Sequence, residues 1–237
     1  METRSKRVTR VLCAAGPQGS AEAVERLLKA AGDLDVQAVA VVGDLGGGSD
    51  RAADYRALFQ ALGHAGWPAY WVPGPADAPI EEYLREAQNI EVVFPFVRGV
   101  HGTAAFAPDG HIVFAGFGGH VSDDPAEPRE EVQSLRYPRW EPEYRLKVRN
   151  ELHEHQLVLL LATPPAHKGL GTPGSEELAE LVNTHRPRLV VCGGERGSEM
   201  LGTSLVVAPG SLADGHYAVA DLHTKEAELG ELTAWAS

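Results

Sequence analysis

The feature that most constrains the fold is a unit repeated three times near the start of the chain: a short apolar run, a glycine- or proline-rich break, and a helical pattern. The apolar runs lie at residues 8–15, 36–42 and 69–72. Each run is short and contains β-branched or aromatic residues, which favours a buried strand. The helical patterns lie at about residues 20–31, 50–65 and 80–87, with Ser20 placed to cap the first and Ser49 or Asp50 the second. Because strand–helix–strand units join parallel strands, we predict a largely parallel sheet covered by helices.

A second, more antiparallel sheet is predicted from the pattern that follows. Its first strands are expected at the short β-type stretches at residues 92–93, 103–107 and 111–115. Pro108-Asp109-Gly110 has the composition of a hairpin turn. The later strands are expected at the apolar runs at 157–161, 189–192, 204–207 and 217–222, with a helix at 175–184 between the first two. No linker or internal repeat divides the chain, so we expect one domain over residues 1–237.

A charged, proline-rich segment interrupts this second half. Residues 122–142 lead into a predicted helix at 141–153, and we interpret 122–151 as an excursion on the surface. The segment carries aromatic and arginine side chains of the kinds enriched in binding hot spots. They are Arg136, Tyr137, Arg139, Trp140, Tyr144 and Arg145. Two alternatives follow: the segment is an interface, for a partner or for a homo-oligomer, or it is an arm packed on its own domain.

Charge and cysteine content exclude several classes of protein. A formal net charge of −12 should repel a phosphate backbone, so nucleic acid is not expected as a partner. The apolar run at 11–15 is too short for a signal peptide or a membrane span, and we expect a cytoplasmic protein without membrane contact. Cys13 and Cys192 both lie in predicted buried strands, where cysteine usually acts as a small core residue.

Glycine-rich or polar segments follow five of the predicted strands. They are Gly16-Pro17-Gln18-Gly19, Gly43-Asp44, Gly74-Pro75-Ala76-Asp77, Leu161-Ala162-Thr163-Pro164-Pro165 and Gly193-Gly194-Glu195-Arg196. In order and spacing they resemble the signatures of the calcineurin-like metallophosphoesterases, which run D-x-H-G, G-D-x-x, G-N-H-D, a lone His and G-H-T-H. Ala208-Pro209-Gly210-Ser211-Leu212 resembles the N-P-G-S that follows in many members. The resemblance implies a four-layer α/β/β/α sandwich with two central mixed sheets and a site in the loops at one edge.

The resemblance also implies which residues have replaced the family's metal ligands. Asp44 keeps the bridging aspartate, and Asp77 keeps the last residue of the third block. The other ligand positions of the family are occupied by Gly16, Gln18, Pro75, Ala162, Gly194 and Arg196. Ala76 stands where the family has its catalytic histidine. Glycine, alanine and proline side chains offer no lone pair to a cation. We therefore expect no metal cofactor, with a single divalent metal as the alternative.

Six polar residues stay as candidates for ligand binding: Asp44, His120, His167, Lys168, Glu195 and Arg196. Arg196 could pair with Asp44, or bind an anion together with the loop that carries His167 and Lys168. His120 could act as a base or a donor. Each has a structural alternative, since an Asp beside glycines is often a turn residue and loop charges are usually solvated. Asp77 is more simply explained as the N-cap of the helix at 80–87.

These observations lead to one hypothesis and two alternatives. The chain is predicted to be non-catalytic and to bind a partner protein or a small anionic ligand at or near the vacated site. The first alternative is a metal-dependent phosphoesterase or other hydrolase whose site is rebuilt from Asp44, Asp77, His120, His167 and Glu195. The second is an interaction or oligomerisation module that uses the 122–151 excursion.

Overall fold

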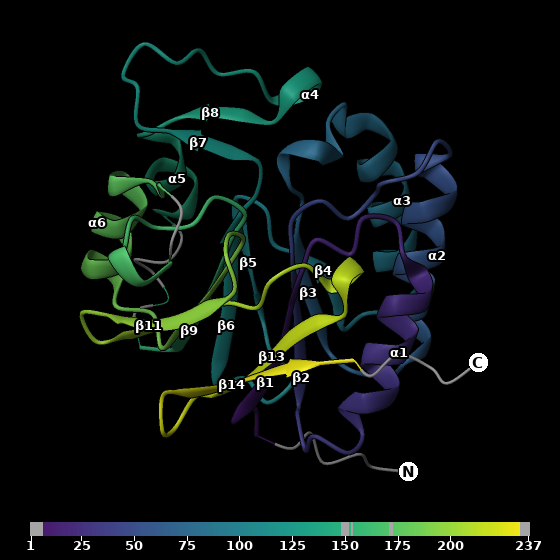
Figure 1. Cartoon of the computed structure of the whole chain (residues 1–237). Coiled ribbons are helices and arrows are strands. Elements are labelled where there is room, and N and C mark those ends of the chain that lie inside the picture. The colour runs from purple at the N-terminus through teal and green to yellow at the C-terminus, as the bar shows by residue number, and fades with distance from the viewer. Residues whose placement is uncertain (1–6, 148–151, 153, 171–172, 233–237) are drawn as a thin grey trace.

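The computed structural model describes residues 7–147, 152, 154–170 and 173–232, and contains two large sheets that face each other (Figure 1). The first sheet has the order β14-β13-β1-β2-β3-β4. Its parallel strands are β1 (Arg10–Ala15), β2 (Ala38–Val42), β3 (Ala69–Val72) and β4 (Val97–Gly99). The antiparallel strands β13 (His216–Asp221) and β14 (Glu226–Glu231) complete it. The predicted parallel βα units are therefore confirmed.

The second sheet has the order β11-β12-β10-β9-β6-β5. Its four central strands are parallel: β12 (Ser204–Ala208), β10 (Leu189–Cys192), β9 (Gln156–Leu161) and β6 (Ile112–Phe117). The antiparallel strands at its edges are β11 (Gly197–Leu201) and β5 (Thr103–Phe106). The predicted antiparallel character holds only at these edges.

Helices cover the outer face of each sheet, which gives the expected four-layer α/β/β/α sandwich (Figure 1). The first sheet is covered by α1 (Ala21–Ala31), α2 (Arg51–His64) and α3 (Ile80–Val93). The second is covered by α5 (Glu141–Arg145) and α6 (Glu176–His185). Ser20 and Asp50 accept the backbone N–H groups of Ala23 and Ala53, at 3.2 and 3.1 Å, so the cap at Ser20 is confirmed and Asp50 is the second cap of the two alternatives. No helix in the described part of the chain is long and apolar enough to cross a membrane.

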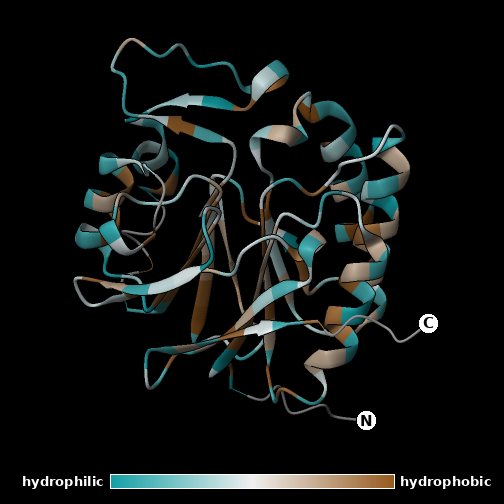
Figure 2. Ribbon diagram, viewed as in Figure 1, coloured by the Kyte–Doolittle hydropathy of each residue, from teal (hydrophilic) through white to brown (hydrophobic). Residues whose placement is uncertain are grey.

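Apolar side chains fill the space between the sheets and beneath the helices. Figure 2 shows the apolar residues, in brown, along the central strands. The rings of Tyr70 in β3 and Phe114 in β6 stack across the inner layer, with centroids 3.8 Å apart. Cys13 and Cys192 are free, fully buried thiols, as the sequence predicts for core residues. Burial raises the pKa of the Cys192 thiol to about 12, so this cysteine is uncharged and unreactive at neutral pH.

The excursion carries a small third sheet. It contains the paired strands β7 (His120–Ser122) and β8 (Arg136–Pro138) and the short helix α4 (Glu131–Ser134). Arg145 holds its parts together, because its guanidinium lies 2.8 and 2.9 Å from the two carboxylate oxygens of Glu131 and 2.8 Å from Glu141. The excursion contacts the body through Tyr137, whose hydroxyl lies 3.0 Å from Nε2 of His101.

Two predicted boundaries are wrong. Helix α3 continues to Val93, so residues 92–93 end a helix and form no strand; both valines are exposed, at 87% and 65%. Two adjacent valines are too few to show the periodicity of a strand or of a helix. The helix is stabilised by its buried residues between Ile80 and Ile90, which pack on the core. The helix predicted at 141–153 ends at Arg145, and residues 148–151 and 153 lie outside the described residues.

Candidate functional site

A cavity of about 310 Å³ lies where the carboxyl ends of β1 and β2 meet those of β9 and β10. The loops that follow these four strands supply most of its wall. Six of the positions named from the sequence line it: Gly16, Gln18, Asp44, Pro75, Ala162 and Gly194. Gly210 and Ser211, which follow β12, complete the wall. Residues far apart in the sequence are thus brought to one edge of the two sheets, where parallel sheets commonly place their sites.

The loops after β1 and β2 run alongside each other in an unusual backbone conformation. Gln18 and Asp44 are both in the left-handed region, with φ of 48° and 45°. This region costs a residue with a side chain about 1 kcal/mol or more. The backbone N–H of Gln18 donates to the backbone carbonyl of Asp44 at 2.9 Å, which holds the two loops in register. The strained backbone is therefore fixed by contacts between the loops.

Asp44 carries the one charged side chain among the described residues that line the cavity. Its Oδ1 accepts the backbone N–H of Ala76 at 3.0 Å, which links the loop after β2 to the 3-10 turn η1 (Pro75–Asp77). Asp44 is half-buried, so part of its carboxylate still faces solvent. The residue is both a structural link between two loops and the main source of negative charge at the cavity.

Asp77 lies behind the cavity wall and is fully buried. Its carboxylate accepts four hydrogen bonds, from the backbone N–H groups of Leu45, Gly46 and Gly74 at 2.9, 2.9 and 2.7 Å and from the Tyr55 hydroxyl at 2.9 Å. Burial raises the pKa of Asp77, and the four donors act in the opposite direction. The N-cap prediction is wrong, because Pro79 caps α3 without a side-chain hydrogen bond. Asp77 instead joins the loops after β2 and β3.

The glycines at 46–48 are needed for close packing. A Cβ on Gly46 would lie 2.8 Å from the Tyr55 ring, and one on Gly47 would overlap the carbonyl of Gln18. The loop is pressed against α2 on one side and against the loop after β1 on the other, which helps to shape the cavity.

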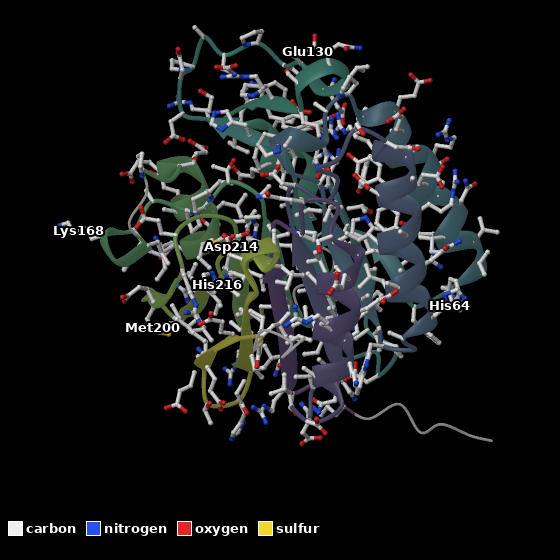
Figure 3. The ribbon with its side chains drawn as sticks, turned by 45° about the vertical axis from the view of Figure 1, so that its right-hand side comes forward. His64, Glu130, Lys168, Met200, Asp214 and His216 are labelled. Carbon is white, nitrogen blue, oxygen red and sulfur yellow. The ribbon has the colours of Figure 1, made fainter. Side chains whose placement is uncertain are left out.

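Apart from Asp44, the structure does not bring the polar candidates for ligand binding to the wall of the cavity. Arg196 donates from Nη2 to the Gly230 carbonyl at 2.9 Å, and among the described residues it forms no ion pair with Asp44. The Nδ1 atom of His167 accepts the N–H of Gly169 at 3.2 Å, and Lys168 points outward at the margin of the molecule (Figure 3). Glu195 is exposed, and His120 lies in β7. The predicted pairing of Arg196 with Asp44 is thus wrong.

The residues of the cavity do not fit a two-metal centre. Within the described ranges, no three His, Cys, Asp or Glu side chains are close enough to hold a metal ion. The side-chain donors in the cavity wall are the Asp44 carboxylate, the Gln18 amide and the Ser211 hydroxyl. Two divalent ions need about four to six ligands each, mostly carboxylate and imidazole groups. A single carboxylate with two neutral oxygens cannot meet that requirement.

Sequence reasoning missed one supporting residue, Tyr55. Its hydroxyl is the fourth donor to Asp77, and its ring is the surface on which Gly46 packs. The sequence gives a weak signal, because Tyr55 lies in the first turns of a helix that directly follows the glycine segment. An aromatic side chain at such a place is more often read as core.

Comparison with known proteins agrees with this architecture. The family model described as "Metallophosphoesterase, calcineurin superfamily" matches residues 1–232. The crystal structure of TT1561 of Thermus thermophilus is 43% identical, covers 95% of this chain and 100% of that one, and superimposes with a TM-score of 0.88. No curated protein matches.

More distant structures share the fold alone. A novel archaeal phosphodiesterase is 10% identical with a TM-score of 0.53, and covers 94% of this chain and 99% of its own. The NAD nucleotidase of Haemophilus influenzae is 12% identical with a TM-score of 0.56, and covers 94% of this chain and 49% of its own. The match of the family model to nearly the whole chain, on the fold described above, shows that the chain belongs to the calcineurin superfamily of metallophosphoesterases.

Proposed function

We propose that this chain is a non-catalytic member of its family that has lost the two-metal chemistry and acts by binding. The observation that carries this proposal is the cavity: its position and its strained loops are those of a site, but its wall offers one carboxylate among the described residues. The binding hypothesis from the sequence names a partner protein or a small anionic ligand. Selective loss of ligands on an intact scaffold supports a change from catalysis to recognition.

The reaction of the family depends on the residues that are missing. Two ions held about 3.5–4 Å apart clamp the phosphoryl oxygens and supply the attacking hydroxide. In this chain Ala162 and Gly194 stand at two histidine positions of that scheme, and neither has a side-chain donor. No step of that reaction can be assigned to the residues present.

Charge at the cavity favours a protein partner there over an anion. Asp44 gives the wall negative charge, and Arg196 and Lys168 are directed elsewhere. A small anion would meet an opposing carboxylate, whereas a lysine or arginine from a partner would find an ion pair that is partly shielded from water. We therefore assign the cavity to a cationic group of a partner protein.

No observation on the described residues favours the rebuilt hydrolase site. That alternative needs Asp44, Asp77 and one or more of the histidines to converge on one point. The Asp77 carboxylate already accepts four hydrogen bonds from within the protein. His167 accepts a hydrogen bond from Gly169 in its own loop. We therefore propose no hydrolase activity for these residues.

Hydrolysis of bis(p-nitrophenyl) phosphate with added Mn²⁺ tests the catalytic half of the proposal. We expect the same rate for the parent chain and for Asp44→Asn, with neither above a protein-free control. The variant separates true activity from a contaminating enzyme, because a contaminant is indifferent to Asp44. Metal-dependent turnover that Asp44→Asn abolishes would overturn the proposal.

Site-specific photocross-linking in cells tests the binding half. A cross-linking residue at Gln18, which is exposed at the rim of the cavity, should form an adduct with a discrete partner. The matched control is the same residue at Gln88, which is exposed on α3. The adduct should be lost when Asp44→Lys is added. Adducts of equal yield from both positions, or adducts indifferent to Asp44→Lys, would contradict a partner at the cavity.

A further inference from the structure

A second cavity, which we call the basic pocket, lies at the opposite end of the strands. Its volume is about 440 Å³. Its wall is built where β9, β10 and β12 begin and where the β13–β14 hairpin turns. The ionisable residues in the wall are Glu154, His155, His185, Arg186, Arg188 and Lys225. Among the described residues, three fixed cations therefore surround one hollow with a single carboxylate, in a chain whose net charge is −12.

Backbone carbonyls, and no carboxylates of the described residues, position two of these cations. Arg188 donates from Nε to the carbonyl of Leu222 and from Nη2 to that of His223, the latter at 3.1 Å. Lys225 donates from Nζ to the carbonyl of Thr203 at 2.6 Å. Carbonyl partners hold a side chain in place without cancelling its charge, and both groups keep further N–H donors. The two cations are thus oriented and still able to bind an anion.

Arg186 completes the arrangement. It ends α6 in a left-handed conformation, with φ of 47°, and its side chain is exposed at the mouth of the pocket. Within the part of the chain that the structure describes, Arg186, Arg188 and Lys225 take part in no ion pair. Elsewhere in the same chain arginines pair with carboxylates, as Arg145 does with Glu131. The basic pocket is the place where cations gather without their usual partners.

A buried polar atom at the same wall also lacks a partner. The Nδ1 atom of His155 is buried and forms no hydrogen bond with any described residue. Buried polar atoms are normally satisfied, so a water or ligand that reaches Nδ1 would supply the partner that it lacks. Three cations around one cavity also repel each other, and an anion would relieve that repulsion.

We propose that the basic pocket binds a small polyvalent anion of the phosphate class, held directly by Arg186, Arg188 and Lys225. Two arginines and a lysine match the donor pattern that recognises phosphoryl oxygens. The pocket can hold more than one phosphoryl group, so we choose inorganic pyrophosphate as the probe. This site is separate from the cavity at Asp44, and its test does not depend on whether the chain is catalytic.

Calorimetric titration of the full chain with pyrophosphate at low salt tests the proposal. We expect one site, and a loss of affinity of about tenfold or more in Arg186→Gln/Lys225→Gln, the effect of removing at least one charge-assisted hydrogen bond. The matched control is Arg139→Gln/Lys168→Gln, which removes the same charge at exposed positions away from the pocket. The control should bind like the parent.

Three results would overturn the proposal. They are no binding to the parent at millimolar pyrophosphate, equal binding by the parent and the pocket variant, or equal weakening in the pocket variant and the control. If the double variant does not fold, Arg186→Gln alone replaces it, since that side chain makes no hydrogen bond within the described residues. Loss of affinity in this single variant, with its thermal unfolding unchanged, would then support the proposal.

Discussion

The hydroxyl of Tyr55 donates a 2.9 Å hydrogen bond to Oδ1 of Asp77, and this contact connects helix α2 to the loops around the cavity. Asp77 does not line the cavity itself. It holds together the two loops that do, by accepting N–H groups from residues that follow β2 and β3. The shape of the cavity therefore depends on a buried carboxylate that has no contact with any ligand placed there.

Replacing Asp77 with asparagine should destabilise the protein. The amide NH₂ would face N–H donors that now have a carboxylate oxygen, so at least one buried donor would be left without a partner. We expect a loss of about 2–4 kcal/mol in the free energy of unfolding, measured by urea titration. Asp50→Asn is the control, because asparagine caps a helix as well as aspartate does. Equal stability of the two variants would contradict the role assigned to Asp77.

The left-handed conformation of Gln18 predicts a substitution that increases the stability of the protein. Gln18→Gly removes the steric cost of φ 48° but makes the unfolded chain more flexible. We expect a net gain of about 0.5–1 kcal/mol in the free energy of unfolding. Gln18→Ala keeps the Cβ and should leave stability unchanged. A gain with alanine equal to that with glycine would show that the side chain, and not the backbone, is responsible.

The ion pair of the excursion predicts a dependence on pH. His101 and the Arg145 guanidinium lower the pKa of Glu131. Arg145 makes the closer contact, because its nitrogens lie 2.8 and 2.9 Å from the carboxylate oxygens, whereas Nε2 of His101 lies 3.7 Å away and burial lowers the pKa of that histidine. A carboxyl whose pKa is lowered by folding stabilises the protein above its unfolded pKa of about 4.3, and this contribution is lost as the pH falls. Stability should therefore decline below about pH 4–5.

Glu131→Gln tests that assignment. The variant should be less stable than the parent near neutral pH, and the difference should shrink as the pH falls below about 4, where the unfolded parent chain takes up a proton that the folded carboxylate resists. Urea unfolding at a series of pH values measures both effects. A difference that stays constant over the whole range would mean that the charge of Glu131 plays no part.

The aromatic group of the excursion divides into buried and exposed members. Tyr137 is fully buried, while Trp140 and Tyr144 are 56% and 60% exposed and meet edge to face, with centroids 6.1 Å apart. If the excursion is a subunit interface, Trp140→Ala/Tyr144→Ala lowers the mass measured by light scattering and leaves thermal stability unchanged, because exposed side chains add little to folding. Equal masses for the parent and the variant would remove the excursion as a subunit interface.

Local patterns in the sequence predict much of this fold, and contacts between distant residues explain most of what they miss. The caps at Ser20 and Asp50 depend on neighbours three residues away, so they can be read directly. The function of Asp77 depends on the loop more than thirty residues earlier, and its N-cap pattern competes with that long-range bonding. The resemblance places Arg196 at a ligand position of the family, but its side chain is directed by the hydrogen bond to the Gly230 carbonyl on β14. The order of the loops in the sequence predicted which of them meet at the cavity. It could not predict the direction of a long side chain such as that of Arg196.

Restoring ligands gives a positive test of the cavity. Gln18, Pro75 and Ala162 line it together with Asp44, and all three positions already carry a side chain. The triple change Gln18→His, Pro75→Asn and Ala162→His should therefore create a site that binds Zn²⁺ or Mn²⁺. Calorimetry should detect binding to the variant and none to the parent. A variant that folds and takes up no metal would show that these loops are not held as the family's site requires.

The most direct test of the central claim is the metal content of the parent protein. The chain would be purified untagged and without chelator, dialysed against excess Mn²⁺, Fe²⁺ and Zn²⁺, and then measured by plasma mass spectrometry. Because the described residues of the cavity wall include one carboxylate and no imidazole, we predict far less than one equivalent of transition metal per chain. About two equivalents per chain would contradict the account and restore a two-metal hydrolase.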